Sequence, residues 1–472
     1  MTNLNTRHLS LFAIKLLLLV SLSCDKSKSE PELVLRRVST GSLIAKQYES
    51  IAAPIEIGVF DGAGNAVAGQ EVSLAVSAEE GSVDVSRATT NADGVVSFNW
   101  VLGEPLNQLL KAELVDDPAV SLTLSAKATY NYRTPERAND GWDIGDLASL
   151  GTNAVDLLTQ GMNELRDNRY PETHSILMIH KGELLLEGYF PGSNSNGQFI
   201  EWDRTTRHEI QSASKSFRSM LIGIAIERGF IEGVDQPLFS FFPEYEQYND
   251  EESKGRITLE HMLTMSSGLA WVEWAAPFGT PTNNLSQMYS QPANTWVPYV
   301  LSRPMAFEPG STFVYNTGAS LMLDDIIAAS IDTDLGVFNR LYYSNLVEGG
   351  ATTNPNAATM TPRDMARMGQ VFVNGGYWKE NQVISEEWIE RSVTPEFIGA
   401  STSGGDYGYQ WWSQDFGGGK HHAWLASGNG GQYVFVFNEL DLVVVSTGGN
   451  FGSSDMFNIY NWIEDYVLKV FD

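Results

Sequence analysis

The sequence predicts an α+β protein whose chain begins with an all-β region. Residues 174–189 form two apolar runs separated by Lys181-Gly182, which is typical of two strands joined by a tight turn. Apolar residues then recur at helical spacing from Phe217 to Ile224, and Gly229 stands where a C-terminal cap is expected. In contrast, residues 33–130 alternate short β-rich runs with turns, a pattern that predicts a small β-sandwich.

Length and charge limit the organisation and the partners of the chain. With 472 residues it exceeds a typical single domain, so we expect two folded units with connecting segments. The 43% hydrophobic content and the 12 tryptophans are sufficient for a large core. Acidic residues outnumber basic ones by 58 to 30, which gives a formal charge of −28. This charge argues against nucleic-acid binding, because little basic surface is available to neutralise phosphates.

The N-terminus predicts export. Arg7 precedes an apolar run over residues 11–20 that is too short to span a bilayer, so residues 1–23 are interpreted as a signal peptide. Cys24, the only cysteine, follows directly and excludes an intramolecular disulfide and a cysteine-based metal site. Its position resembles a bacterial lipoprotein processing site, with Cys24 as the lipidated residue and 24–32 as a tether. The alternative is ordinary cleavage after Ser23, which would release a secreted protein.

The all-β region at 33–130 carries no cluster of residues that suggests chemistry. Its turns and short strands resemble bacterial immunoglobulin-like domains of the invasin and intimin type. We interpret it as a spacer, with binding of a surface partner as the alternative. Residues 131–150 are interpreted as a linker and 151–472 as the second domain. The β-sandwich is predicted from β-rich runs at 55–60, 72–76 and 95–101 and from turns at 61–64 and 91–94.

Ser212 and Lys215 are the main catalytic candidates. They stand three residues apart at the predicted start of a helix, so both side chains face the same side. A serine hydroxyl needs a partner that accepts its proton, and a buried lysine can do so once its pKa is lowered. Unpaired backbone N–H groups at a helix start also favour an oxyanion nearby. By itself this spacing is also common by chance on protein surfaces.

Four further sequence segments support a catalytic interpretation of the Ser212–Lys215 spacing. Together with Ser212 and Lys215 they make residues 151–472 resemble the serine β-lactamase and penicillin-binding-protein superfamily, in particular class C β-lactamase-like esterases and amidases such as 6-aminohexanoate-dimer hydrolase. The resemblance implies a β-lactamase-like antiparallel sheet flanked by helices. The blocks, in family order, are residues 257–269, 309–318, 361–369 with 374–378, and 407–412.

The resemblance implies roles for single residues. Ser212 is the acylated nucleophile, Lys215 its activating partner, and Tyr315 the tyrosine that shuttles protons. The third position of the tyrosine motif is Thr317, which keeps a hydroxyl for substrate binding but lacks the usual amide. A tyrosine phenol has an ordinary pKa of about 10, so its use as a base requires nearby cations such as Lys215.

A glycine-rich segment, residues 426–432, occupies the place of the family's third motif. The resemblance implies that the backbone N–H of Asn429 pairs with that of Ser212 as oxyanion donors, with Ser427 and Gly428 in the substrate-binding strand. Ala426 stands where the family usually has Lys or His. A cation there would hold a substrate carboxylate, so its loss argues against β-lactams and peptide C-termini.

The remaining candidate site residues are interpreted as structural. The pair His421-His422 lacks the spacing of a helical zinc site, and residues 417–420 are interpreted as a hairpin turn. Asp364 and Arg367 are spaced for a structural ion pair. The loop where related enzymes build the pocket rim contains Trp271, Glu273 and Trp274. We interpret each of them as packing, with an aromatic rim suited to an uncharged amide or ester as the alternative.

These observations predict an exported serine hydrolase that cleaves an ester or amide through an acyl-enzyme on Ser212. No cofactor and no metal are expected. The expected partners are a small-molecule ester or amide and, through Cys24, a membrane, but no nucleic acid. Two alternatives remain: a cell-wall DD-peptidase or β-lactamase, and a catalytically silent surface adhesion or binding protein.

Overall fold

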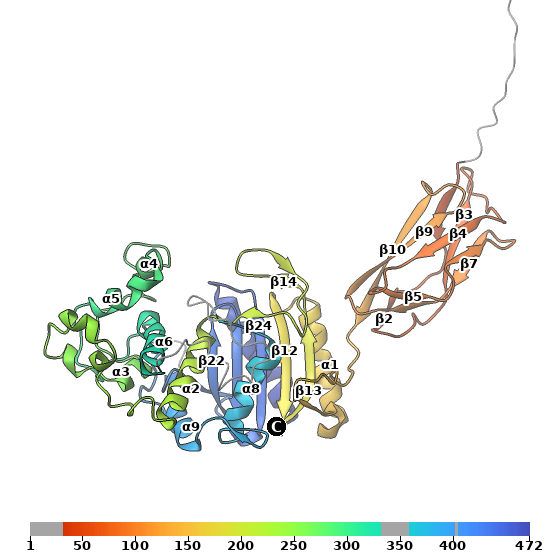
Figure 1. Cartoon of the computed structure of the whole chain (residues 1–472). Coiled ribbons are helices and arrows are strands. Elements are labelled where there is room, and N and C mark those ends of the chain that lie inside the picture. The colour runs from red at the N-terminus through yellow and green to blue at the C-terminus, as the bar shows by residue number, and fades with distance from the viewer. Residues whose placement is uncertain (1–31, 332–357, 402–404) are drawn as a thin grey trace, which may run out of the picture. The chain divides into compact units, whose positions relative to one another are not determined.

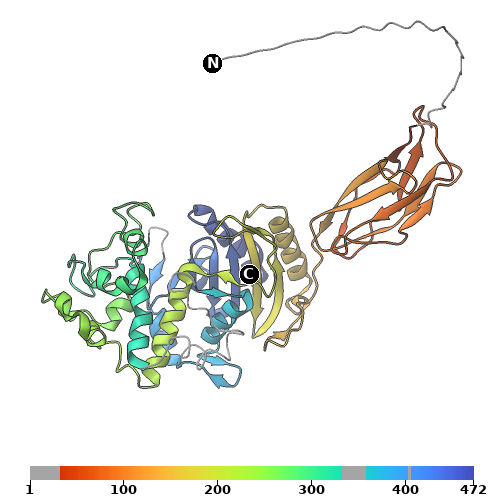
Figure 2. The same ribbon diagram turned by 45° about the horizontal axis from the view of Figure 1, so that its top comes forward.

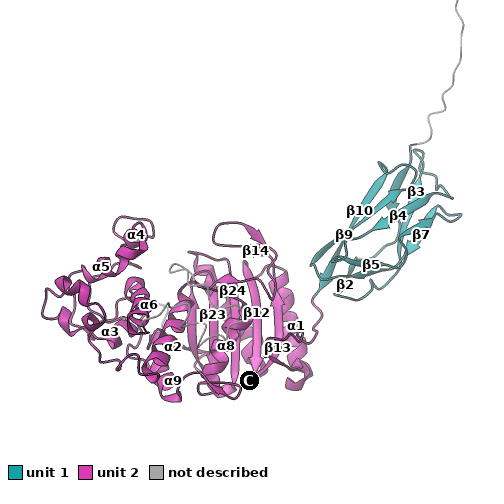
Figure 3. Ribbon diagram, in the orientation of Figure 1, with its two compact units in different colours: residues 1–129 teal, residues 130–472 magenta. Residues whose placement is uncertain are grey.

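The computed structural model describes residues 32–331, 358–401 and 405–472. The predicted signal peptide, Cys24 and nearly all of the tether lie outside this range. The chain divides into two compact units, residues 1–129 and 130–472, coloured separately in Figure 3. No helix among the described residues is both long enough and apolar enough to cross a bilayer.

In its described part, residues 32–129, the regular secondary structure of unit 1 consists of β-strands. A three-stranded sheet, β1-β3-β7, and a five-stranded sheet, β2-β10-β9-β4-β6, contribute apolar residues to one shared core. Strands were expected at 55–60, 72–76 and 95–101, and the structure has them, except that the last one divides into β7 and β8 at Asn99. The strands are β1 Val34–Arg37, β2 Ile44–Lys46, β3 Ile55–Phe60, β4 Glu71–Ala75, β5 Gly81–Val83, β6 Arg87–Thr89, β7 Val95–Phe98, β8 Trp100–Leu102, β9 Asn107–Leu114 and β10 Ser121–Thr129.

Unit 2 is organised around an eight-stranded sheet of order β11-β13-β12-β24-β23-β22-β21-β20. All neighbours are antiparallel except β11 and β13. The expected hairpin is confirmed as β12 and β13, with Lys181 and Gly182 both at positive φ in the turn. The strands of this sheet are β11 Asp143–Ile144, β12 Thr173–His180, β13 Glu183–Tyr189, β20 Asp406–Tyr407, β21 Trp412–Phe416, β22 His421–Gly428, β23 Gln432–Phe437 and β24 Leu442–Gly448.

Both faces of this sheet are buried, which explains why its central strands are apolar without alternation. In β12, Leu177 and Ile179 pack into the core shared with α2 and α8, whereas Ile176 and Met178 pack into the core shared with α1 and α10. Figure 1 shows the helices that cover the sheet. The helices are α1 Thr152–Arg166, α2 Ser214–Glu227, α3 Leu259–Leu263, α4 Asn284–Tyr289, α5 Trp296–Leu301, α6 Thr317–Ile331, α8 Pro362–Val373, α9 Glu386–Val393 and α10 Asn458–Trp462.

A helical region formed by α3 to α6 adjoins α2. Helices α2 and α6 lie side by side, as Figure 2 shows. Their contact matters for the site, because α2 begins next to Ser212 and α6 begins at Thr317. The buried side chain of Gln410 ties these elements together: Ser320 donates to its Oε1, and Ser216 donates to its backbone carbonyl.

The segment 131–150 differs from the expected linker. Strand β11 pairs with β13, and Trp142 is buried in the core of unit 2. Asp140 accepts a hydrogen bond from Arg363 at 2.7 Å, and Glu187 binds the same guanidinium at 2.6 Å. These partners come from distant parts of the sequence, so the composition of the segment gives no sign of them.

Several local expectations are confirmed. Helix α2 ends at Glu227 with Gly229 at φ 74°, the left-handed conformation that favours glycine after a helix. Asp364 and Arg367 form a buried ion pair within α8. Residues 417–420 lie in the turn between β21 and β22.

Candidate active site

Ser212 lies in a single 3₁₀ turn, η2 (Gln211–Ala213), which leads directly into α2. Gln211 has φ 50°, a conformation that non-glycine residues rarely adopt, so the chain bends sharply just before Ser212. The turn places Ser212 at the N-terminal, partially positive end of α2. This local structure suits an oxygen that becomes negatively charged during a reaction.

Lys215 contacts Ser212 directly. Its Nζ donates a hydrogen bond of 3.0 Å to Ser212 Oγ, and its side chain is only 4% exposed. Burial lowers the pKa of Lys215 to about 7, against an opposing effect of Glu273 and with a smaller lowering by Arg218. A substantial share of Lys215 is therefore the neutral amine near pH 7, and this form can accept the proton of Ser212.

Tyr315 is the third member of the cluster. Lys215 Nζ lies 5.0 Å from the centroid of its ring. Burial raises the pKa of Tyr315 above its usual value, Glu273 raises it further, and a hydrogen bond with Ser212 lowers it only in part. The phenol therefore stays protonated at neutral pH and is available as a proton donor, which leaves Lys215 as the group that can act as a base.

Thr317 is turned toward Glu273. Its backbone N–H donates to Glu273 Oε2 at 2.9 Å and its hydroxyl to Oε1 at 2.6 Å. We expected the hydroxyl to be available for substrate, but a carboxylate already occupies it. Thr317 nevertheless lines the same cavity as Ser212.

Strand β22 passes close to the Ser212 turn. A Cβ atom added to Gly428 would lie 2.3 Å from the backbone oxygen of Ile210 and 3.1 Å from the backbone nitrogen of Ala213. The glycine is therefore required by close approach of two backbone segments. The next residue, Asn429, is exposed, and its side chain accepts a hydrogen bond from the N–H of Gly452 at 2.8 Å.

Replacing Gly428 by alanine is expected to displace the Ser212 turn. The new methyl group would contact backbone atoms that cannot rotate away, at a cost of about 1–3 kcal/mol. We expect a lower melting temperature and a fall in esterase kcat/KM of at least about tenfold. Gly233→Ala is the matched control, because a Cβ there meets nothing within 4 Å. Equal activity of the two variants would show that the close approach is not needed.

A cavity of about 520 Å³ opens over these residues. It brings together six of the predicted site residues, which are Ser212, Lys215, Tyr315, Thr317, Ser427 and Asn429. Gly428 lies behind the wall, and Ala426 is fully buried in the core under α2. The remaining lining residues are Gln211, Ser214, Arg218, Glu273, Trp274, Phe278, Asn283, Leu285, Tyr289, Leu321, Ser401, Gly405, Trp412, Gln414, Leu425, Met456, Phe457 and Tyr460.

Two residues that line the cavity have positions that differ from those predicted from the sequence. Trp274 was expected to be packing, yet it is 58% exposed and stacks on Tyr315 with ring centroids 4.4 Å apart. Glu273, also expected to be packing, contacts Thr317 at the edge of the cavity. Only Trp271 is buried as expected. The signal that could have found the other two is their position just after residues 257–269, on a loop that must return to the site.

Arg218 is a cavity residue that the sequence reasoning did not identify. It lies one helical turn after Ser214, donates to Ser214 Oγ at 2.8 Å and binds Asp324 at 2.9 Å. These contacts tie the guanidinium to α6 and reduce its capacity to bind a substrate carboxylate.

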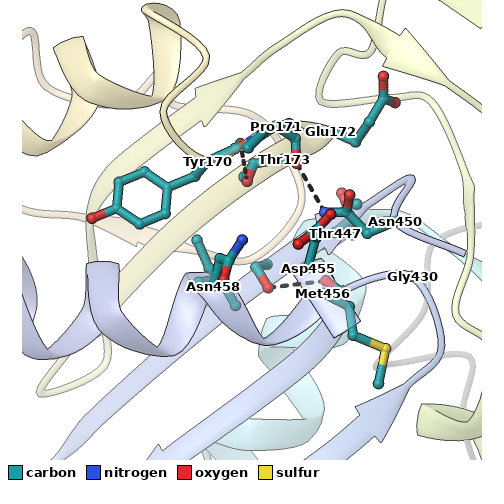
Figure 4. Close-up of a pocket in the computed structure, with 14 residues that line it drawn as sticks. Tyr170, Pro171, Glu172, Thr173, Gly430, Thr447, Asn450, Asp455, Met456 and Asn458 are labelled. Carbon is teal, nitrogen blue, oxygen red and sulfur yellow. Dashed lines mark hydrogen bonds between the residues drawn. The ribbon is translucent and has the colours of Figure 1, made fainter. Parts of the chain in front are cut away.

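A second, very small cavity lies beside the turn between β22 and β23, and Figure 4 shows it. Tyr170, Pro171 and Thr173 line one side, and Asn450 and Asp455 lie across from them. Its volume of about 10 Å³ is enough for one water molecule at most. It is therefore not a candidate for substrate binding.

The described residues contain no group of three or more His, Cys, Asp or Glu side chains arranged to hold a metal ion. His421 and His422 both lie on β22, as a strand interpretation requires. His422 Nδ1 lies 2.8 Å from Asp415.

Comparison with known proteins gives the class of this fold. Residues 170–340 match the β-lactamase family model, and this range includes Ser212, Lys215 and Tyr315. Unit 2 has a β-lactamase-like α+β fold. No sequence among curated proteins matches the chain.

Three solved structures illustrate the likeness. A putative 6-aminohexanoate-dimer hydrolase from Bacillus anthracis is 20% identical, with a TM-score of 0.51, and the match covers 65% of this chain and 80% of that one. EstCE1, a hydrolase with promiscuous acyltransferase activity, is 14% identical, with a TM-score of 0.53 and coverages of 68% and 99%. Simvastatin synthase (LovD) from Aspergillus terreus is 13% identical, with a TM-score of 0.51 and coverages of 67% and 98%. At these identities the likeness establishes the fold alone.

Proposed function

We propose that unit 2 is a serine hydrolase that cleaves an ester or amide through an acyl-enzyme on Ser212. The observation that carries this proposal is the 3.0 Å contact between Lys215 Nζ and Ser212 Oγ beneath an open cavity. The match to the β-lactamase family over residues 170–340 supports it. The predicted signal at residues 1–23 and the lipidation site at Cys24 extend the proposal to an exported, membrane-anchored enzyme, with a secreted one as the alternative.

In the acylation step, the neutral amine of Lys215 takes the proton of Ser212 Oγ as that oxygen bonds to the substrate carbonyl carbon. The carbonyl electrons move to oxygen, where the N–H groups of Ser212 and Asn429 are proposed to donate. Tyr315 gives its proton to the leaving alcohol or amine and regains one from the Lys215 ammonium. The carbon–leaving-group bond then breaks and the acyl-enzyme remains.

Deacylation repeats these events with water as the nucleophile. The neutral amine of Lys215 accepts a proton from the water as the water oxygen bonds to the carbonyl carbon of the Ser212 ester. Tyr315 passes its own proton to the departing Ser212 Oγ and regains one from the Lys215 ammonium. Ser212 Oγ recovers its proton and the free acid leaves. No step requires a metal or an organic cofactor.

The substrate class follows from the charges at the site. Ala426 brings no charge, and the guanidinium of Arg218 is held by Asp324. A substrate carboxylate therefore lacks the strand cation that would bind it, so we propose esters or amides without a carboxylate next to the cleaved bond.

Trapping of the acyl-enzyme tests the proposal. A chromogenic aryl ester should give a burst of phenol equal to the enzyme concentration, and mass spectrometry of quenched protein should place the acyl group on Ser212. A fluorophosphonate should modify the same residue. Absence of both modifications would favour the non-catalytic adhesion alternative. Rapid turnover of a chromogenic β-lactam in the same panel would instead favour the DD-peptidase or β-lactamase alternative.

A further inference from the structure

Glu273 is an acidic group on the wall of the cavity that the proposed mechanism does not use. Its carboxylate accepts three hydrogen bonds, from the Trp271 indole at 2.8 Å, the Thr317 N–H at 2.9 Å and the Thr317 hydroxyl at 2.6 Å. All three donors are neutral, and a carboxylate offers about four acceptor sites. Among the described residues, no Lys, Arg or His nitrogen lies within 4.0 Å of it. The carboxylate therefore has acceptor capacity and negative charge left.

The other charged groups of the cavity do not cancel this charge. Arg218 is already paired with Asp324 at 2.9 Å. Lys215 is buried against Ser212, where the neutral amine is required for the proposed chemistry. With Lys215 neutral and Arg218 balanced by its partner Asp324, which lies outside the lining, the carboxylate of Glu273 is the remaining charge among the described lining residues. The first-turn position of Thr317 in α6 also gives Glu273 a capping role, and any test must separate capping from ligand binding.

Aromatic rings line the same cavity as Glu273. Trp274 stacks on Tyr315 at 4.4 Å, and Trp412 lies parallel to both rings, with centroids 6.1 Å from Trp274 and 6.2 Å from Tyr315. Phe278 and Tyr289 line the same cavity. Aromatic faces carry negative electrostatic potential and attract alkylammonium groups. A carboxylate beside such rings is the combination that recognises a cation with apolar substituents.

We infer that Glu273 and the aromatic wall of Trp274 and Trp412 form a subsite for a substituted ammonium group. This inference rests on the proposed function and narrows its substrate class to esters or amides that carry a positive charge in the acyl or leaving group. The formal charge of −28 acts in the same direction, because it attracts cationic substrates during diffusion. The same field and the Glu273 carboxylate exclude anionic analogues.

Pairs of substrates that have the same shape, but differ in whether they carry a positive charge, test the inference. Acetylcholine and 3,3-dimethylbutyl acetate place the cation or its neutral tert-butyl copy in the leaving group. The 4-nitrophenyl esters of 5-(trimethylammonio)pentanoic acid and of 6,6-dimethylheptanoic acid place the same groups in the acyl chain. At pH 8 and low salt, we expect kcat/KM to favour the cation by about tenfold or more in at least one pair. Equal or better hydrolysis of both neutral esters would overturn the inference.

Variants separate recognition from capping. Glu273→Gln keeps the size and an acceptor oxygen for Thr317 but removes the charge, so within each pair the ratio of cationic to neutral kcat/KM should fall to about one, mainly through a higher KM for the cationic ester. Trp274→Leu should weaken the preference in the same direction. Glu232→Gln, an exposed charge change, should leave the preference intact. An equal loss on both members of each pair in Glu273→Gln would show that Glu273 only supports the structure.

A binding measurement makes the inference independent of catalysis. Quenching of tryptophan fluorescence in the Ser212→Ala protein should report choline binding at least about tenfold tighter than binding of 3,3-dimethylbutan-1-ol. With Glu273→Gln added, the two affinities should converge. If no ester is hydrolysed but choline binds selectively, the proposed function fails and the cation site stands. If esters are hydrolysed without any preference and choline does not bind selectively, only the cation site fails.

Discussion

Ser212→Ala is expected to reduce hydrolysis of a short-chain aryl ester by at least about 10⁴-fold. Without Oγ there is no atom to form the acyl-enzyme, and Lys215 loses its 3.0 Å partner. The fold should survive, because Ser212 lies in a surface-accessible turn and its hydroxyl supports no core contact. Initial rates, with circular dichroism as the measure of folding, check this result.

The control is Ser240→Ala, which removes an exposed hydroxyl in the same unit and should leave turnover unchanged. Burst amplitude gives a second, independent measure, since the alanine variant should show none. A folded Ser212→Ala protein that retains wild-type turnover would contradict the acyl-enzyme mechanism.

Lys215→Met should lower turnover by about 10³-fold and at the same time raise thermal stability. Methionine approximates the shape of the lysine chain but accepts no proton. Burial holds the pKa of folded Lys215 at about 7, far below its ordinary 10.5. The unfolded chain therefore binds the proton more tightly than the native state, and this group penalises folding fully below about pH 7. The penalty fades as pH rises toward the unfolded value.

The gain in melting temperature on replacing Lys215 should accordingly be largest at or below about pH 7 and should shrink by about pH 10. In the wild-type enzyme, kcat/KM should fall as pH drops below about 7, because the amine becomes protonated and can no longer accept the Ser212 proton. A flat pH profile through this range would argue against Lys215 as the base. A less stable Lys215→Met protein would show that the lost hydrogen bond to Ser212 outweighs the cost of burying the amine.

Much of the fold is local enough to be predicted from sequence. The hairpin β12–β13 is bounded by a Lys-Gly turn, and α2 displays its apolar spacing and its terminal glycine at Gly229. The short contact between Ser212 and Lys215 also follows from spacing, because three residues along a helical turn bring side chains together. Tyr315 needed the order of several sequence blocks, since it lies about a hundred residues further on and meets Ser212 only through packing of α6 on α2.

The missed features depend on loops and on distant partners. Trp274 and Glu273 belong to a loop whose path is fixed by Asn283, which donates to the carbonyl oxygens of Glu273 and Ala276. Nothing in the composition of residues 271–283 indicates that one tryptophan faces the core and another faces the cavity. The role of Arg363 was equally hidden, because its partners Asp140 and Glu187 come from separate segments.

The folding of residues 130–150 onto unit 2 decides where this chain could be divided. Strand β11 covers the edge of β13, and an uncovered edge strand is a template for unwanted pairing with another chain. A fragment that begins at residue 151 would expose that edge. It would also remove Asp140, one of the two carboxylates that bind the buried Arg363, and leave Glu187 as the other. The natural cut lies at the boundary between residues 129 and 130, so the compact unit of the candidate enzyme includes residues 131–150, which the sequence presents as a linker.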